Sequence, residues 1–458
     1  MSDSSLPAKR KKGLSVRMAS LAGGGRMNYS TRVAEELSRV RAKEGDIVRV
    51  KSKGGERTGV LMPHHEFSDP DVLVLKLKSG YNIGVRLEEG ASVEVVGKGE
   101  KKERHPRHQL SNEAARKIAV IGTGGTIASY VDYRTGAVHP ALSAEDLMAT
   151  VPEISDLCQI DAKVLFSIFS ENMRVEHWQR IAEATADRLS SGDEGCIVPH
   201  GTDTMGYTSA ALSFMLGELP RSVVLVGAQR SSDRPSSDAY SNLLAATRFC
   251  LEADAAEVFV LMHAGISDTS ASVHRGTRVR KMHTSRRDAF QSINSSPVAK
   301  VEFEKGIEVL SPLRPKSSSK VSLRTAMEEK VSLIQFYPGM STRSFGSLAK
   351  GERGIVIAGT GLGHVSADLI KEIRKAIAGG TTVVMCSQCL HGRVNLNVYD
   401  TGRDLLAAGV IPGEDMLPET AYIKLMWALA NTSSEEELRS TMITDLRGEL
   451  SQRREIDD

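Results

Sequence analysis

Two hydroxyl-rich loops carry the residues best suited to chemistry. Residues 122–128 and 199–205 each follow a run that is typical of a buried strand. Ligands of parallel sheets bind beyond the carboxyl ends of the strands, so Thr126 in the first loop and Thr202 in the second can face each other across one crevice. The glycines of the first loop also let a substrate approach the backbone amides closely. We therefore predict that Thr126 and Thr202 are catalytic hydroxyls.

A neutral threonine hydroxyl is a poor nucleophile and needs a base or a proton relay within hydrogen-bonding reach. Asp203, next to Thr202, supplies a carboxylate. Lys281 is the candidate for a lysine that accepts or relays a proton beside that carboxylate. Its position in a basic run, residues 278–283, is also typical of a solvated face.

Other chemistries are less well supported. The loop at 122–128 lacks a complete G-x-G-x-x-G and a Lys-Ser/Thr ending, which argues against a nucleotide-binding loop. A plain tight turn is the alternative interpretation of this loop. Cys386 and Cys389, with His391 nearby, could form a zinc site, but no second pair lies at a suitable spacing. We therefore expect buried, reduced thiols and no bound metal.

Composition limits the class of protein. The chain has 458 residues, of which 40% are hydrophobic and 25% charged, so it can form two or three cores. A net charge of +2 is too small to indicate a nucleic-acid-binding protein by itself. The basic clusters at 9–12 and 101–108 are best explained as solvated tail and linker, with phosphate steering as the alternative. An apolar run of roughly 18 residues and a signal-peptide pattern are both lacking, which predicts a cytoplasmic protein without membrane spans.

The elements that must position these residues fall into successive segments. Five short strand-like runs within residues 44–98 predict a small closed β-barrel. From residue 116, alternating strand-like and helix-like runs predict an α/β fold with parallel sheets in two domains. The expected boundaries are: 1–43, a basic and partly disordered extension with a short helix near 30–41; 44–98, the barrel; 99–115, a charged linker; 116–311, the first α/β domain with the catalytic loops; 312–328, a second linker; 329–445, the second α/β domain; 446–458, a tail.

Two segments resemble the signatures of the L-asparaginase/glutaminase family. These are TGGTIA at 123–128 and HGTDTM at 200–205, in this order and each after a strand. Residues 170–173 resemble the family's substrate-holding Ser-Gln segment, and residues 226–230 and Lys281 also match. Tyr133 lies where the family carries a tyrosine on its lid. The likeness extends from about residue 116 to residue 445.

The resemblance implies specific roles. Thr126 would attack the side-chain carboxamide, assisted by Tyr133. Thr202, Asp203 and Lys281 would form a second cluster that activates a nucleophile or water and binds the amino-acid end of the substrate. The order in which the two threonines act stays open.

Two further residues would hold the substrate. By the same resemblance, Ser170 would hold the α-carboxylate. At Glu171 the chain departs from the free enzymes, because a carboxylate replaces the carboxamide there. Glu171 could pair more strongly with a substrate ammonium, so a preference for asparagine does not transfer directly to this chain.

The barrel and linker ahead of the first catalytic strand set the chain apart from free asparaginases. With the runs at 71–84, 399–405 and 413–420, this arrangement resembles the D-type subunit family of archaeal glutamyl-tRNA(Gln) amidotransferases. That resemblance implies that the chain hydrolyses glutamine to glutamate and ammonia. A partner, the E-type subunit of the same amidotransferase, would use the ammonia with ATP and Mg²⁺ to convert Glu-tRNA(Gln) to Gln-tRNA(Gln).

The same resemblance implies how the complex is organised. The chain itself would bind no cofactor, would assemble as a heterotetramer with two copies of each subunit type, and would meet tRNA(Gln) mainly through the E-type subunit. Two alternatives remain: a free-standing L-asparaginase and a non-catalytic tRNA-binding scaffold. The scaffold is disfavoured, because a site that had lost its catalytic function would have no physical need to keep all four of the candidate residues, Thr126, Thr202, Asp203 and Lys281.

Overall fold

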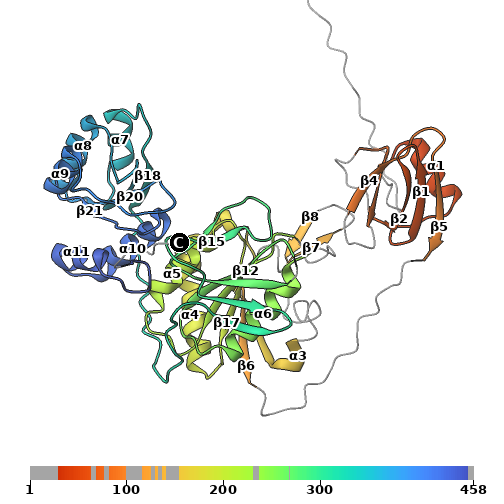
Figure 1. Ribbon diagram of the computed structural model, residues 1–458, viewed down its shortest axis with the longest axis horizontal. Coiled ribbons are helices and arrows are strands. Elements are labelled where there is room, and N and C mark those ends of the chain that lie inside the picture. The colour runs from red at the N-terminus through yellow and green to blue at the C-terminus, as the bar shows by residue number, and fades with distance from the viewer. Residues whose placement is uncertain are drawn as a thin grey trace, which may run out of the picture. The chain divides into compact units, whose positions relative to one another are not determined.

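The computed structural model of the chain describes residues 29–62, 69–76, 82–98, 116–124, 129–132, 137–140, 154–230, 237–267 and 269–451 (Figure 1). It divides into two compact units: residues 1–77 with 82–99, and residues 78–81 with 100–458. The linker predicted at 99–115 and residues 1–28 of the predicted extension lie outside the described residues. None of the described helices combines the length and the apolar character needed to cross a membrane.

The first unit is a short helix and a five-stranded antiparallel sheet. Its elements are α1 (Thr31–Arg39), β1 (Ile47–Ser52), β2 (Gly55–Leu61), β3 (Val72–Lys76), β4 (Asn82–Arg86) and β5 (Ser92–Gly97). Ser30 caps α1 by accepting a hydrogen bond from the backbone N–H of Val33. Val33 and Leu37 of α1 join the apolar residues of the sheet in one core. The strand order is β4-β3-β2-β1-β5, which agrees with the small all-β region predicted at 44–98; among the described residues no ladder joins β4 to β5.

The first α/β domain of the second unit contains an eight-stranded sheet in the order β17-β16-β13-β12-β11-β10-β6-β9. Its strands are β6 (Lys117–Gly122), β9 (Gln159–Val164), β10 (Cys196–Pro199), β11 (Val223–Val226), β12 (Val258–His263), β13 (Ser270–Arg275), β16 (Ala299–Glu302) and β17 (Gly306–Val309). Strands β9, β6, β10, β11 and β12 run parallel to one another, as predicted. Strands β13, β16 and β17 add an antiparallel extension that was not predicted.

Helices cover both faces of this sheet (Figure 1). They are α3 (Ile154–Leu157), α4 (Val175–Ser190), α5 (Met205–Met215) and α6 (Ala239–Glu252), and a 3₁₀ turn, η2 (Ser170–Asn172), precedes α4. The buried strands alternate between two cores. Cys196 and Val198 of β10 pack in the core with α4 and α5, and Ile197 packs in the core with α6. This alternation explains why the strands are apolar throughout, since both of their faces are covered.

Two small hairpins complete this domain. They are β7 (Ser129–Asp132) with β8 (Ala137–Pro140), and β14 (Val279–Lys281) with β15 (Phe290–Ser292). The second hairpin lies close to α5, which begins directly after the loop at 200–204. It therefore presents the end of β14 near that loop.

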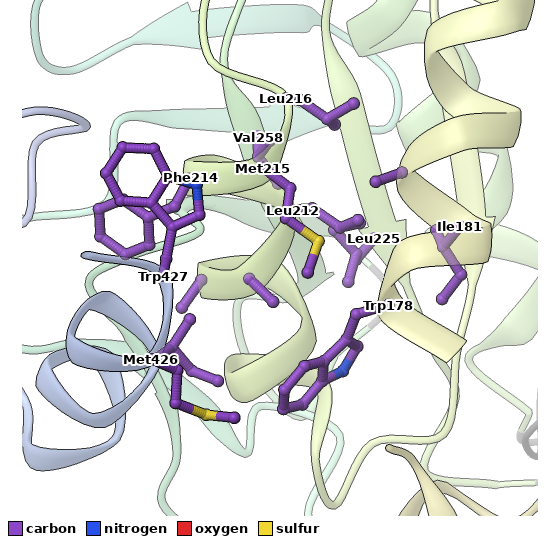
Figure 2. Packing of buried hydrophobic residues seen from close by; sticks show 14 of the residues in the cluster. Trp178, Ile181, Leu212, Phe214, Met215, Leu216, Leu225, Val258, Met426 and Trp427 are labelled. Atoms are coloured by element: carbon purple, nitrogen blue, oxygen red, sulfur yellow. The ribbon is translucent and has the colours of Figure 1, made fainter. Parts of the chain in front are cut away.

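The second α/β domain has a four-stranded parallel sheet, β18 (Val331–Gln335), β19 (Gly354–Gly359), β20 (Thr382–Ser387) and β21 (Ile411–Pro412). Its helices are α7 (Thr342–Ala349), α8 (Ala367–Ala378), α9 (Asp400–Ala407), α10 (Pro418–Asn431) and α11 (Glu435–Ile443). Trp427 of α10 stacks on Phe214 of α5, with ring centroids 6.0 Å apart, so one core joins the two domains (Figure 2).

Two segments predicted as a linker and a tail are fixed to this unit. The irregular stretch at 312–328 is bonded through its backbone, as when Arg324 N–H donates to the Met215 carbonyl at 2.7 Å. Residues 445–451 are also anchored, and the Glu449 side chain is fully buried. The last described residues are therefore part of the packed domain.

Candidate active site

The carboxyl ends of neighbouring parallel strands bring two loops into contact. β10 and β11 are paired in register, Pro199 with Val226, and the loops that follow them begin at His200 and Gly227. A Cβ atom at Gly227 would lie 2.8 Å from Thr202 Cγ2. Glycine is therefore required at 227 for the loop after β11 to approach Thr202 so closely.

Thr202, Asp203 and Lys281 come together at this edge of the sheet. Lys281 Nζ lies 2.8 Å from Thr202 Oγ1 and 2.8 Å from Asp203 Oδ1. Lys281 is the last residue of β14, and its side chain is 13% exposed, whereas that of Asp203 is 70% exposed. Thr202 is 8% exposed. A largely buried amine thus contacts one hydroxyl and one carboxylate that opens to solvent.

This arrangement suits the activation of a hydroxyl. As placed, the Lys281 amine donates to both oxygens, so a positive charge faces the Thr202 hydroxyl. That charge stabilises negative charge developing on the hydroxyl oxygen as its proton leaves. The Asp203 carboxylate balances the lysine charge and keeps the amine in place.

The predicted substrate-binding residues lie beside the second loop. Ser170 opens η2 and is 4% exposed, while Glu171 is exposed. The Thr204 hydroxyl donates to the Ser170 carbonyl at 2.7 Å. A Cβ atom at Gly201 would lie 2.6 Å from Ser170 Cβ. The turn at 170–172 is therefore packed directly against the loop at 200–204.

Thr126 and Tyr133 lie outside the described residues, so their positions and roles remain predictions. The structure describes the start of their loop. Thr123 Oγ1 donates to the Pro199 carbonyl at 2.7 Å, which attaches that loop to the end of β10. At Gly124 the backbone has φ of +102°, and a Cβ atom would lie 2.6 Å from the Ile168 carbonyl oxygen, so glycine is required there.

His200 fixes the loop at 200–204 through buried hydrogen bonds, a role that we did not predict from the sequence. Its Nδ1 donates to the Gly201 carbonyl at 2.7 Å, and its Nε2 accepts from the Thr208 hydroxyl at 2.9 Å. Trp178 Nε1 in turn donates to Thr208 Oγ1 at 3.0 Å. Burial lowers the pKa of His200 to about 4, so the ring is neutral and supports the loop through one tautomer.

The loop after β11 also has buried support. The Asp238 carboxylate accepts from the backbone N–H groups of Gln229 and Arg230, and Asn242 Nδ2 donates both to Asp238 and to the Gly227 carbonyl. Asp238 and Asn242 are fully buried. Their contribution could not be recognised in the sequence, because neither residue belongs to a motif.

The cysteine pair does not form a metal cluster with its described neighbours. Cys386 is buried and Cys389 is exposed, so the prediction of buried thiols applies to Cys386 alone. Burial raises the pKa of the Cys386 thiol, which keeps it protonated and unreactive. In the part of the chain that the structure describes, no group of three or more His, Cys, Asp or Glu side chains could hold a metal ion.

Acid is expected to destabilise the fold through His200 and His274. Burial lowers the pKa of each to about 4, from 6.5 in an unfolded chain. Between these pH values the unfolded state binds more protons, so stability is complete above pH 6.5 and falls as the pH drops toward 4. Each histidine contributes about 3 kcal/mol over that window. Urea unfolding at pH 7.5 and 4.5 measures the loss.

The matched variant is His200→Asn, which keeps a donor for the Gly201 carbonyl and removes the titration. It should lose about 2 to 3 kcal/mol less stability than the unmodified chain between pH 7.5 and 4.5. Equal losses in the two proteins would show that His200 does not titrate in this window.

Comparisons with known proteins relate most of the chain to known sequences. Three family models match: "Asparaginase, N-terminal" at residues 117–314, "Glutaminase/Asparaginase C-terminal domain" at 330–442 and "GatD N-terminal domain" at 42–96. The D-type subunit of the glutamyl-tRNA(Gln) amidotransferase of Pyrococcus furiosus is 53% identical over 433 residues, covering 92% of this chain and 98% of that protein. The corresponding protein of Thermococcus kodakarensis is 50% identical, covering 92% of this chain and 97% of that protein.

Solved structures resemble the second unit. The thermostable L-asparaginase from Thermococcus kodakarensis has a TM-score of 0.65 and 33% identity, covering 74% of this chain and all of that chain. L-asparaginase I from Vibrio cholerae has a TM-score of 0.65 and 29% identity, with the same coverage. The region that carries Thr202, Asp203 and Lys281 therefore has an asparaginase fold.

Proposed function

The chain belongs to the D-type subunit family of glutamyl-tRNA(Gln) amidotransferases, and on that premise we propose that Thr202, Asp203 and Lys281 form part of the centre at which it hydrolyses glutamine. It is the glutaminase subunit of a tRNA-dependent amidotransferase, an enzyme in which the asparaginase-like region performs the amide hydrolysis. The observation that carries the site is the 2.8 Å contact of Lys281 Nζ with both Thr202 Oγ1 and Asp203 Oδ1.

The reaction needs one nucleophile and one route for protons. A threonine oxygen attacks the side-chain carbonyl carbon of glutamine, while its hydroxyl proton leaves toward a base. The C–N bond then breaks, and the nitrogen leaves as ammonia after it takes up a proton. Water hydrolyses the resulting ester, which releases glutamate and restores the hydroxyl. We propose that Thr126 attacks the side-chain carboxamide, assisted by Tyr133, and that the cluster around Lys281 activates a nucleophile or water.

Substrate recognition follows from charge. We assign the α-carboxylate of glutamine to Ser170 and its ammonium to Glu171. Glu171 is exposed and adjoins the loop that carries Thr202, which supports this assignment. A carboxylate at this position pairs more strongly with an ammonium than a carboxamide does.

The E-type subunit is the partner of this chain in the amidotransferase. We propose that two copies of each subunit type assemble, that the E-type subunit handles ATP and Mg²⁺, and that tRNA(Gln) binds mainly through it. The chain itself would then bind no cofactor. In this arrangement the ammonia released from glutamine is consumed by the partner on glutamate carried by tRNA(Gln).

The partner and its tRNA are expected to stimulate the glutaminase. Ammonia release from glutamine should rise about 5- to 150-fold when the E-type subunit and Glu-tRNA(Gln) are added to the chain, because coupling between two sites is usually about 1 to 3 kcal/mol. An ammonia assay on the chain alone, with the partner, and with the partner plus charged tRNA measures the rise. Asparagine serves as the control substrate and should be a poorer one in the full complex.

The alternatives give different results in the same assay. A free-standing L-asparaginase would hydrolyse asparagine in preference to glutamine and would be indifferent to the E-type subunit. A non-catalytic scaffold would release no ammonia under any of these conditions. Either result would refute the proposed function.

A further inference from the structure

The strand that ends in Lys281 lies between the two α/β domains. Alternate residues of a strand point to opposite sides. On one side, Val279 packs in the core with α5, and Lys281 contacts Thr202 and Asp203 of the first domain. On the other side, Arg278 and Arg280 pair with carboxylates of the second domain. The second domain therefore contacts the side of the strand opposite to the Lys281 side chain.

Arg278 makes the strongest of these contacts. Its side chain is 2% exposed, and Nη1 lies 2.9 Å from Asp415 Oδ2. Nε donates to the Gly448 carbonyl at 2.8 Å, and Nη2 donates to Ser451 Oγ at 2.8 Å. A planar guanidinium with three separate partners has one allowed orientation, so it fixes the backbone that carries it.

The partners of Arg278 are themselves fixed. Ser451 N–H donates to Asp415 Oδ1 at 3.1 Å. Glu449, two residues before Ser451, is fully buried, and its carboxylate lies 2.5 Å from Lys424 Nζ of α10. The same carboxylate accepts a hydrogen bond from the backbone N–H of Arg447. We call residues 445–451 the C-terminal segment. It is attached to α10 on one side and to Arg278 on the other.

Three neighbours of Arg278 extend this attachment along the hairpin. The Thr277 hydroxyl donates to the Arg447 carbonyl at 3.0 Å, and Arg280 pairs with Glu419 at 3.3 Å. On the far side of the hairpin, the Asn294 side chain donates to the Asp415 carbonyl at 2.9 Å. Strand β14 and the residues that flank the hairpin at both of its ends are thus bonded to the second domain.

We propose that Arg278 is a positioning residue for glutamine hydrolysis. Asp415 and the C-terminal segment of the second domain fix the position of β14. In that position the Lys281 amine contacts Thr202 and Asp203. The inference rests on the proposed role of Lys281. A displacement of about 1 Å at a catalytic group can cost about a hundredfold in rate, so loss of Arg278 acts on turnover.

The test compares Arg278→Met with Arg278→Lys in the complex with the E-type subunit. In Arg278→Met we expect kcat for ammonia release to fall about a hundredfold, with KM within about threefold of its original value, because Ser170 and Glu171, to which we assign the charged groups of glutamine, are untouched. Arg278→Lys keeps the charge toward Asp415 and should recover part of the lost kcat. A purely structural role would predict no selective change in kcat of the folded fraction.

Arg188→Met is the matched control. Arg188 lies on α4, ahead of β10, and pairs with the buried Asp193 at 2.9 Å, so its loss also removes an arginine from a buried carboxylate. It is at the amino-terminal edge of the sheet, away from Lys281, and its loss should leave kcat unchanged. An equal fall in kcat in Arg188→Met and Arg278→Met would overturn the inference.

If Arg278→Met fails to fold, Asp415→Asn tests the same contact from the side of the second domain. It preserves side-chain size and the backbone carbonyl, and it should lower kcat in the same direction. Full kcat in folded Asp415→Asn or Arg278→Met, together with inactive Lys281→Met, would refute the positioning role and leave the proposed function intact. Full turnover in Lys281→Met would instead refute the catalytic role on which it rests.

Discussion

Thr202→Val is expected to lower ammonia release from glutamine by at least about a thousandfold, because it removes the hydroxyl that Lys281 contacts. Valine keeps the branched shape of threonine, and Thr202 is 8% exposed, so the loop should keep its packing. Lys281 also retains Asp203 at 2.8 Å as a partner for its charge. Steady-state ammonia assays in the complex with the E-type subunit measure the effect, and thermal unfolding checks the fold.

Two variants make this result specific. Thr202→Ser restores a hydroxyl and should recover much of the lost activity. Thr185→Val makes the same change at a fully buried threonine of α4, whose hydroxyl neighbours Cys196, and should leave turnover unchanged. If Thr202→Val kept more than about a tenth of the original kcat, Thr202 could not be an essential hydroxyl.

The fold was predictable where burial is complete. β10, β11 and β12 are buried at every residue, and apart from His263 at the end of β12 their runs are apolar, so they stand out in the sequence. β13 contains Ser270, His274 and Arg275 among its residues, and β17 is an edge strand that is largely exposed. These antiparallel strands were missed because β13 carries polar residues and β17 is not fully buried, and such strands are not distinguished from loops by hydrophobicity alone.

The site was predictable only as far as local patterns reach. The loop at 200–205 is a contiguous motif after a strand, whereas Lys281 reaches Thr202 across 79 positions of the chain. No local pattern encodes such a contact, and only the family resemblance and the chemistry of a proton relay singled out that lysine. His200 belongs to the recognised motif, but its support of the loop depends on Thr208 and Trp178.

The basic run at 278–283 illustrates the remaining limit. Its composition is also typical of a solvated face, yet Arg278 is 2% exposed and pairs with Asp415. The run was ambiguous because its composition does not show that the second domain faces Arg278 and Arg280 with the carboxylates of Asp415 and Glu419. Charges can occupy such a strand only where the facing domain supplies carboxylates and carbonyls.

Lys281→Met is the second substitution expected to have a large effect, lowering kcat for ammonia release by about 10² to 10⁴. Methionine fills much of the space of the lysine stem but can neither stabilise charge on Thr202 Oγ1 nor carry a proton. Asp203→Asn should cost less, because a carboxamide oxygen still accepts a hydrogen bond from the amine. Both are measured in the complex with the E-type subunit, with thermal unfolding as the check on folding.

The double variant decides whether these residues act as one unit. If Asp203 works by holding and neutralising Lys281, its loss has nothing further to remove once the amine is gone, so Lys281→Met with Asp203→Asn should be about as slow as Lys281→Met alone. Independent contributions would instead multiply. A double variant slower than Lys281→Met by the full factor of Asp203→Asn would mean that Asp203 acts on the substrate directly, and the 2.8 Å contact between the carboxylate and the amine would then be incidental to catalysis.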